Sequence, residues 1–314
     1  MANPNSNPLI SVVLPTYNGS RYLNDSIKSV VEQTWKNWQL ILVDDCSTDA
    51  TPEIIAGWMK TDSRIRYVRN ETNLKLPRSL NRGFEMATGD FLTWTSDDNL
   101  YRPTALQAML EFLRAHPATG LVYADFSDIG EQGEVIRDVY AAEPESLAEG
   151  NCVRACFMYP AEVRRRIGNY DETKFLVEDW DYWLRIAYEF PLGCLHQNLY
   201  LYRWHANSLT TTKKAQVDAA IRTLLEANLP KMKWAGQRAR AGGYLKLAEL
   251  ADEAGDEESS RKFFKSAWSH APIWSARHAR RKAVEMWLGQ TISRRLATVL
   301  RGGKYTDVGL KNTP

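Results

Sequence analysis

The sequence has few cysteines and no long hydrophobic run. Its four cysteines form neither a Cys-x-x-Cys pair nor a cysteine and histidine spacing typical of zinc sites, so we expect reduced thiols. No stretch of about 18 apolar residues occurs, and the polar segment 1–8 lacks the basic and apolar parts of a signal peptide. These absences predict a cytoplasmic protein that neither enters the secretory route nor spans a membrane.

Glycine and proline occur at ordinary frequency, with 18 and 13 residues in a chain of 314. With 44% hydrophobic and 25% charged residues, this composition excludes disordered and fibrous proteins. The length suffices for one large or two ordinary domains. The net charge of +2 is uneven, because residues 1–230 carry −7 and residues 231–314 carry +9. The basic part could contact nucleic acid, an anionic membrane surface or the acidic part of the same chain.

Residues 10–124 alternate short apolar runs with amphipathic stretches. The apolar runs, predicted to be strands, are 10–14, 40–43, 65–68, 91–94 and 121–124. The helical patterns between them are 22–33, a segment that begins at Thr51-Pro52, 79–87 and 103–115. This alternation predicts an α/β fold, with a Rossmann-like, mostly parallel central sheet and helices on both faces. Such sheets bind ligands beyond the carboxyl ends of their strands.

The alternation loosens after residue 125. We expect a hairpin at 130–139, a helix at 179–189 and a late strand at 199–202. Residues 213–314 show only helical patterns, so we place a domain boundary after residue 212. Segments 239–254 and 257–270 are similar to one tetratricopeptide-like helix pair, although one such unit cannot close a core alone.

Acidic pairs follow two of the predicted strands. Asp44 and Asp45 come directly after the second strand, and Asp97 and Asp98 follow the fourth. Turns or helix caps explain either pair alone. At matching ends of two parallel strands, both pairs would face one crevice, where hard oxygen ligands suit a divalent cation beside a phosphate-bearing ligand. A departing diphosphate needs such a cation to neutralise its charge.

Six ordered motifs between about residues 10 and 209 resemble the inverting glycosyltransferases of family two, which have the GT-A fold. They are Val-Leu-Pro-Thr-Tyr-Asn (13–18), Val-Asp-Asp-Cys-Ser-Thr-Asp (43–49), 73–83 followed by Ala-Thr-Gly-Asp (87–90), Ser-Asp-Asp (96–98), Glu-Asp (178–179), and Tyr-Arg-Trp-His (202–205) with Ser208. Segment 95–101 is most similar to the spore-coat polysaccharide glycosyltransferase type. The resemblance implies that residues 1–212 form a GT-A domain. Such a domain would move a sugar from a nucleotide-sugar donor, expected to be a UDP-sugar, to a saccharide hydroxyl in surface polysaccharide or glycoconjugate synthesis.

The resemblance also implies a donor site. Asp45 would accept a hydrogen bond from a uracil-type imide, and Pro15 and Tyr17 would line the same pocket. Asp97 would lie near the ribose and the metal, and Asp98 would be the main protein ligand of Mn²⁺ or Mg²⁺.

Four further residues, Thr95, His205, Arg203 and Arg78, lie in or beside these motifs. Thr95 stands at the first acidic position of the commoner Asp-x-Asp motif, where it cannot bind metal as a carboxylate does. His205 is expected either as a metal ligand, as the resemblance implies, or as a half-buried histidine with a satisfied hydrogen bond. Arg203 is expected either to contact the negatively charged phosphates of the donor or to cap the edge of the sheet. Arg78, just before a helix, is a candidate for contacting the phosphates of the donor.

The Glu-Asp motif implies the catalytic base. In family two the aspartate of this motif takes a proton from the acceptor hydroxyl, because the hydroxyl is a poor nucleophile until it loses that proton. The resemblance therefore implies this role for Asp179, with Asp181 as the alternative. The hydroxyl would attack the anomeric carbon from the face opposite the diphosphate. Trp180, beside the base, is expected to offer the acceptor an aromatic platform, and Asn99 is expected to touch donor or acceptor.

Residues 283–300 have the pattern of an amphipathic helix flanked by basic residues. Such a helix either packs on the acidic domain or lies on an anionic membrane surface, which would give peripheral contact with the inner face of the cell membrane. We expect no nucleic-acid partner, since no binding motif accompanies the charge. The alternative to an enzyme is a non-catalytic nucleotide-binding protein with a partner-recruiting tail. Thr95 favours that alternative, whereas Asp98 and Asp179 favour the enzyme.

Overall fold

The computed structural model describes residues 7–206 and 208–279. Its first half alternates strands and helices as the sequence predicts. The elements are β1 (Ile10–Thr16), α1 (Leu23–Val31), β2 (Trp38–Asp44), α2 (Thr51–Thr61), β3 (Ile65–Arg69), α3 (Leu76–Glu85), β4 (Phe91–Trp94), β5 (Leu100–Tyr101) and α4 (Ala105–Ala115). They are followed by β6 (Leu121–Ile129), β7 (Val135–Val139), the 3-10 helix η1 (Pro144–Ala148), β8 (Phe157–Pro160), α5 (Ala161–Ile167), α6 (Glu178–Glu189) and β9 (Leu192–Arg203).

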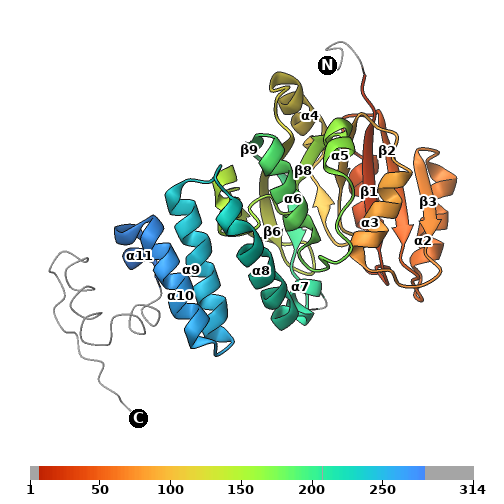
Figure 1. The fold of residues 1–314 in the computed structure, drawn as a ribbon. Helices are drawn as coiled ribbons and strands as arrows, with labels where there is room; N and C mark the ends of the chain where they lie inside the picture. Colours follow the sequence, from red (N-terminus) through yellow and green to blue (C-terminus); the bar gives the residue numbers. More distant parts are fainter. Residues whose placement is uncertain (1–6, 207, 280–314) are drawn as a thin grey trace. The chain divides into compact units, whose positions relative to one another are not determined.

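The strands form one sheet in the order β3-β2-β1-β4-β8-β6-β9-β5, and β7 pairs with β6 (Figure 1). The pairs β3–β2, β2–β1 and β1–β4 are parallel. The register places Thr16, the last residue of β1, opposite Asp44, the last residue of β2. The carboxyl ends of these strands therefore meet at one edge, as expected for the predicted parallel sheet.

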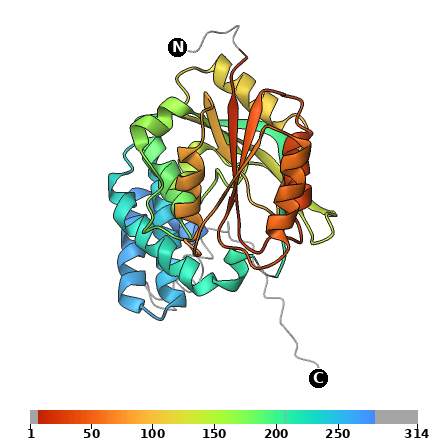
Figure 2. The ribbon, with the colours of Figure 1, turned by 90° about the vertical axis from the view of Figure 1, so that its right-hand side faces the viewer.

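Helices cover both faces of this parallel part (Figure 2), which explains why its central strands β1 and β2 are buried along their whole length. On one face, Val12 and Leu14 belong to the same buried cluster as Leu23 of α1. On the other, Val13 meets α3 so closely that a Cβ added to Gly83 would lie 2.4 Å from its Cγ1 atom. The expected α/β class with helices on both faces is confirmed.

The second half of the sheet is mixed. Strand β8 is antiparallel to both β4 and β6, whereas β9 runs parallel to β6. β6 and β7 form the hairpin expected at 130–139. Strand β8 was not predicted, and β9 begins at Leu192, well before the expected late strand at 199–202.

The chain forms two compact units, Met1–Ile221 and Arg222–Pro314. This division lies within α8 (Lys214–Asn228), which follows α7 (Leu209–Thr212), and so comes later in the chain than residue 212. The described part of the second unit consists of η2 (Leu229–Lys231), α9 (Gln237–Glu253), α10 (Glu257–His270) and α11 (Pro272–His278). Helices α9 and α10 form the expected pair, joined through Gly255, whose φ of 76° suits glycine.

No helix in residues 7–206 or 208–279 combines the length and the apolar character needed to cross a bilayer. The amphipathic segment predicted at 283–300 lies outside the described residues.

Candidate active site

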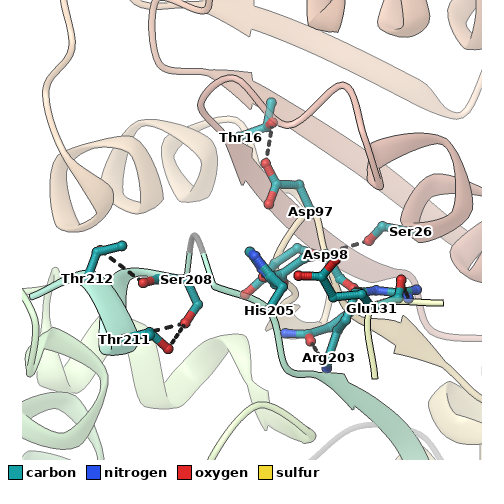
Figure 3. A network of polar contacts seen from close by, with 12 residues as sticks. Thr16, Ser26, Asp97, Asp98, Glu131, Arg203, His205, Ser208, Thr211 and Thr212 are labelled. Atoms are coloured by element: carbon teal, nitrogen blue, oxygen red, sulfur yellow. Dashed lines mark hydrogen bonds and ion pairs between the residues drawn. The ribbon is translucent and has the colours of Figure 1, made fainter. Parts of the chain in front are cut away.

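The loops that follow β1 and β4 meet at the carboxyl edge of the sheet. The Thr16 hydroxyl donates a hydrogen bond to Oδ2 of Asp97 over 2.5 Å, as Figure 3 shows. Gly19 passes so close to this pair that an added Cβ would lie 2.1 Å from Oδ2 of Asp97. The Asp97 carboxylate is therefore held against the β1 loop, and only a residue without a side chain fits at position 19.

Asp97 and Asp98 are adjacent carboxylates in a poorly solvated place. Burial, followed by the charge of Asp98, raises the pKa of Asp97 to about 7. A bound cation would counter both effects, because it favours the charged form of each carboxylate.

Asp98 faces His205, which comes from the end of β9 (Figure 3). Its Oδ2 atom lies 2.9 Å from Nε2 of His205, and this hydrogen bond raises the pKa of the histidine. The other oxygen, Oδ1, is buried and has no hydrogen-bond partner. A buried carboxylate oxygen without a partner is costly, and a divalent cation would satisfy it. The residues present thus fit the expected metal, with Asp98 and His205 as the pair around it.

Thr95 takes no part in this arrangement. Its hydroxyl lies 2.6 Å from the Tyr200 hydroxyl inside the sheet. That position is consistent with the expectation that the metal is held without an acid at position 95.

Arg203 caps the sheet edge. Its guanidinium donates to the carbonyl oxygens of Asp98 (2.8 Å) and Glu131 (2.9 Å), and its backbone N–H donates to Oδ1 of Asn99 (2.8 Å). Of the two roles left open for Arg203, the structure favours the cap over a phosphate contact. Asn99 is 2% exposed, so its side chain orients β9 and offers little surface to an acceptor or donor.

Asp45 is a buried carboxylate surrounded by N–H donors. Its Oδ1 atom accepts hydrogen bonds from the Asn70 side chain and the Leu74 backbone, both over 2.7 Å. Its Oδ2 atom accepts one, from the backbone N–H of Lys75 over 2.9 Å. Since a carboxylate oxygen has two lone pairs, Oδ2 retains capacity for one further donor. Asp44, by contrast, bonds to other parts of the protein, because its carboxylate accepts hydrogen bonds from the Ser47 backbone N–H and the Tyr67 hydroxyl.

The other residues expected at the donor site differ in exposure. Pro15 is buried within β1, opposite Val43. The Tyr17 side chain is 50% exposed just beyond the end of β1, where an aromatic ring is available for stacking. Arg78 forms an exposed ion pair with Glu172 over 2.8 Å, so a phosphate would have to compete with that carboxylate.

Asp179 lies in the first turn of α6. Its Oδ2 atom accepts a hydrogen bond from the Asn151 side chain (2.7 Å), and Oδ1 accepts one from the Trp180 backbone N–H (2.6 Å). Burial raises the pKa of Asp179, which makes its carboxylate a stronger base. The alternative base, Asp181, is already paired with Arg185 over 2.9 Å.

Glu178, the first residue of the Glu-Asp motif, is a buried acid to which the motif assigns no role. It is 4% exposed, its Oε2 atom has no hydrogen-bond partner, and burial raises its pKa to about 8. Asn151 is a further residue of this site that no sequence pattern indicates, since a lone asparagine in a loop gives no sign of its distant partner.

Trp180 packs inside the domain. The ring is 3% exposed, and its N–H donates to the carbonyl oxygen of Leu147 over 3.0 Å. This placement does not support the aromatic platform expected for the acceptor. Trp183, one turn further along α6, is buried as well, because this helix is covered on more than one side.

Comparison with known proteins places this site in a family. Residues 11–165 match the profile of glycosyl transferase family 2. Over 194 residues the chain is 35% identical to the putative glycosyltransferase EpsE of Bacillus subtilis, an alignment that covers 59% of this chain and 69% of EpsE.

Solved structures with this fold include two sugar-nucleotide complexes. One is S. aureus TarS 1–349 in complex with UDP-GlcNAc (TM-score 0.64, 14% identity, 95% of this chain and 93% of that chain covered). The other is the mannosyltransferase PcManGT from Pyrobaculum calidifontis, in complex with GDP-Man and Mn²⁺ (TM-score 0.60, 17% identity, 95% and 85% covered). The fold expected from the motifs is therefore confirmed as GT-A-like with a helical C-terminal region. Motifs, fold and relatives together establish that the chain belongs to glycosyl transferase family 2 and is a glycosyltransferase.

Proposed function

We propose that the protein is an inverting, metal-dependent transferase that moves a sugar from a UDP-sugar to a hydroxyl of a saccharide acceptor. The observation that carries this proposal is the Asp98 carboxylate, with one oxygen bound to His205 and the other buried without a partner. That unsatisfied oxygen lies at the sheet edge where ligands of parallel α/β folds bind.

Asp45 would recognise the nucleotide base. The remaining lone pair of its Oδ2 atom would accept a hydrogen bond from the imide N–H of uracil, and the exposed ring of Tyr17 would stack on the base. Guanine also carries a ring N–H beside a carbonyl, and PcManGT was solved with GDP-Man whereas TarS was solved with UDP-GlcNAc. We favour uridine, as the resemblance implies, and the test below compares both nucleotides.

Asp98 and His205 would hold Mn²⁺ or Mg²⁺, with Asp97 beside them. When bound, the cation would neutralise the negative charge of the leaving diphosphate. Asp97 is pre-positioned for this role by Thr16, so little reorganisation of the carboxylate is needed when donor binds. Arg78 could join the phosphates only after leaving Glu172.

Asp179 would act as the general base. Hydrogen bonds from the Asn151 side chain and the Trp180 backbone fix its carboxylate, which takes the proton of the acceptor hydroxyl as the oxygen attacks the anomeric carbon. The bond to the diphosphate breaks on the opposite face, so the anomeric configuration inverts in one displacement. Asp181 is held by Arg185 and makes a weaker candidate.

The acceptor would be a saccharide or a lipid-linked saccharide of a surface polysaccharide or glycoconjugate. Trp180 and Asn99 are buried, so other residues must supply most of the acceptor surface. Peripheral membrane contact through the amphipathic segment 283–300 and its flanking basic residues would bring the enzyme to the membrane that carries a lipid-linked acceptor.

Calorimetric titration with UDP tests the donor site. We expect the wild type to bind UDP with Mn²⁺ and much more weakly without it, and Asp98→Ala to lose the Mn²⁺ effect. Asp62→Ala, on the connection between α2 and β3, is the matched control and should bind as the wild type does. GDP binding in place of UDP would overturn the base assignment, and binding that is the same with and without Mn²⁺ would overturn the metal site.

A further inference from the structure

A cysteine, a histidine and a glutamate converge on the surface of the sheet domain. Cys194 and His196 lie on β9, and Glu143 lies on the connection between β7 and η1. Their ligand atoms all lie within 4.8 Å of one another. The Sγ atom of Cys194 is 3.9 Å from Nε2 of His196, and Oε1 of Glu143 is 3.6 Å from the same nitrogen. The sequence offered no zinc-like spacing, because Glu143 joins the other two only through the fold.

A fourth residue orients the histidine. Asp125 of β6 is 4% exposed, and its Oδ1 atom lies 3.2 Å from Nδ1 of His196. The same oxygen accepts a hydrogen bond from the backbone N–H of Ala141 over 2.7 Å, which fixes its position. A carboxylate bound to one ring nitrogen turns the other toward a cation, the arrangement found around histidine ligands of zinc. Here it aims Nε2 of His196 at Cys194 and Glu143.

The distances agree with a tetrahedral site. Zinc binds nitrogen and oxygen at about 2.0–2.2 Å and sulfur at about 2.3 Å, so neighbouring ligand atoms stand about 3.3–3.6 Å apart. The separations of 3.6 and 3.9 Å around Nε2 of His196 require only a small contraction. The Glu143 side chain is exposed and free to make that movement.

We propose that Cys194, His196 and Glu143 bind Zn²⁺, with Asp125 orienting His196 and solvent in the fourth position. The combination of thiolate, imidazole and carboxylate suits zinc better than Mg²⁺ or Ca²⁺, which prefer oxygen ligands alone. Binding releases the thiol proton of Cys194 to solvent.

The site would tether the connection that follows β7 to strand β9. That connection continues through η1 to Asn151, whose side chain holds Asp179. Zinc would therefore restrict the segment that positions the proposed base. This consequence rests on the proposed function, whereas the metal site itself does not.

Cobalt and zinc titrations of the full-length protein without a histidine tag test the site. Tetrahedral Co²⁺ with a thiolate ligand gives a sulfur-to-metal charge-transfer absorption. The Asp98–His205 site has no thiol, so this absorption reports on a cysteine ligand, and the cysteine variants identify which one it is. In an Asp98→Ala background, which removes the proposed active-site cation, we expect one equivalent of Co²⁺ to produce the absorption and one equivalent of Zn²⁺ to remove it. Cys194→Ser should abolish it, whereas Cys46→Ser, at a cysteine on the β2 loop, should leave it unchanged.

Zinc affinity, measured by competition with a fluorescent chelator, gives the second readout. These measurements use an Asp98→Ala background, so that the proposed active-site cation does not contribute. We expect zinc to bind His196→Ala about 10- to 100-fold more weakly, and we expect a loss of similar size for Asp125→Asn. The asparagine keeps an acceptor for the backbone N–H of Ala141. Far-ultraviolet circular dichroism of each variant identifies any that fail to fold. A wild type without the charge-transfer absorption, or a Cys194→Ser variant with undiminished zinc affinity, would overturn the proposal. In that case His196, Asp125 and Glu143 form an ion-pair network only.

Discussion

Thr16 and Asp97 are 81 positions apart in the chain, and the Thr16 hydroxyl nevertheless donates a 2.5 Å hydrogen bond to the Asp97 carboxylate. Parallel pairing of β1 with β4 brings the two loops together. The bond gives the first member of the acidic pair a fixed orientation before any ligand arrives.

Removal of this hydroxyl should weaken donor binding. We expect Thr16→Val to lower the Mn²⁺-dependent affinity for UDP by about tenfold, equivalent to about 1.4 kcal/mol. Thr16→Ser keeps the hydroxyl and should bind nearly as the wild type does. Calorimetry measures both, and equal affinities for the Val and Ser variants would contradict the role assigned to the bond.

Asp179→Asn should abolish most turnover while preserving donor binding. The amide keeps the shape of the side chain but cannot take a proton, so we expect kcat to fall by about 10²- to 10⁴-fold. Product formation with a sugar nucleotide and acceptor measures the loss, and UDP calorimetry shows that the donor site is intact. Asp181→Asn is the matched control, since that carboxylate binds Arg185, and should retain far more activity. A larger loss for Asp181→Asn would reverse the assignment of the base.

Asp45→Asn should impair recognition of the base. The asparagine would carry an NH2 donor where one of the two acceptor oxygens of Asp45 stands. Both oxygens accept hydrogen bonds from N–H groups of the protein, so the new donor would face another donor. We expect about a 10- to 100-fold loss of UDP affinity, the effect of one lost charge-assisted hydrogen bond. Isothermal titration with UDP measures it, and Asp128→Asn, on β6 next to Arg137, provides a control. Unchanged UDP affinity would exclude Asp45 from the base pocket.

Glu178 should make stability depend on pH. Its pKa is raised from 4.5 to about 8 in the folded protein, so the folded state binds the proton more tightly than the unfolded state. The stabilisation from this acid is complete below pH 4.5 and is lost as pH rises toward 8, at most about a few kcal/mol. Glu178→Gln should remove that slope and gain stability relative to the wild type at pH 9.

Urea unfolding at pH 5 and pH 9 measures the effect, with Glu162→Gln as an exposed control. The difference in free energy of unfolding between Glu178→Gln and the wild type should change with pH, whereas that of Glu162→Gln should not. An equal difference at both pH values would contradict the raised pKa.

Gly83→Ala should destabilise the sheet domain. The new Cβ would lie 2.4 Å from Cγ1 of Val13 and 3.0 Å from Cγ2 of Val43, so α3 would have to move away from β1 and β2. We expect a loss of about 1–3 kcal/mol, typical of an overpacked core. Gly57→Ala in α2, where no atom lies within 4 Å of the new Cβ, should instead stabilise the helix by about 0.5–1 kcal/mol. Chemical denaturation measures both changes.

The sequence predicted the parallel half of the fold because buried strands such as β1 and β2 are unbroken apolar runs with clear ends. It missed β8, a strand of four residues that lies beyond the regular alternation of strands and helices in residues 10–124. It also missed the first half of β9, where His196 and Gln197 are exposed and interrupt the pattern. These strands depend on pairing with β6, which no local pattern reveals.

Motifs in the sequence single out candidate acids, but they do not show which residues the fold brings to those acids. Asp45, Asp98 and Asp179 could be chosen from sequence, but the hydrogen bonds that fix them come from distant segments. Asn70 supplies such a bond to Asp45, Asn151 supplies one to Asp179, and Thr16 does the same for Asp97. Neither spacing nor composition identifies these partners. Trp180 shows the opposite failure, since an aromatic residue beside a proposed base was expected to meet ligand and is buried.

The carboxylate of Asp45 is bound by the backbone N–H groups of Leu74 and Lys75, and Lys75 has a φ of 71°. The shape of the main chain, rather than the side chains at these two positions, orients the Asp45 carboxylate that we propose to bind the base. Substitution of the side chains of Leu74 and Lys75 should therefore leave the orientation of Asp45 unchanged, provided that position 75 still tolerates a left-handed turn.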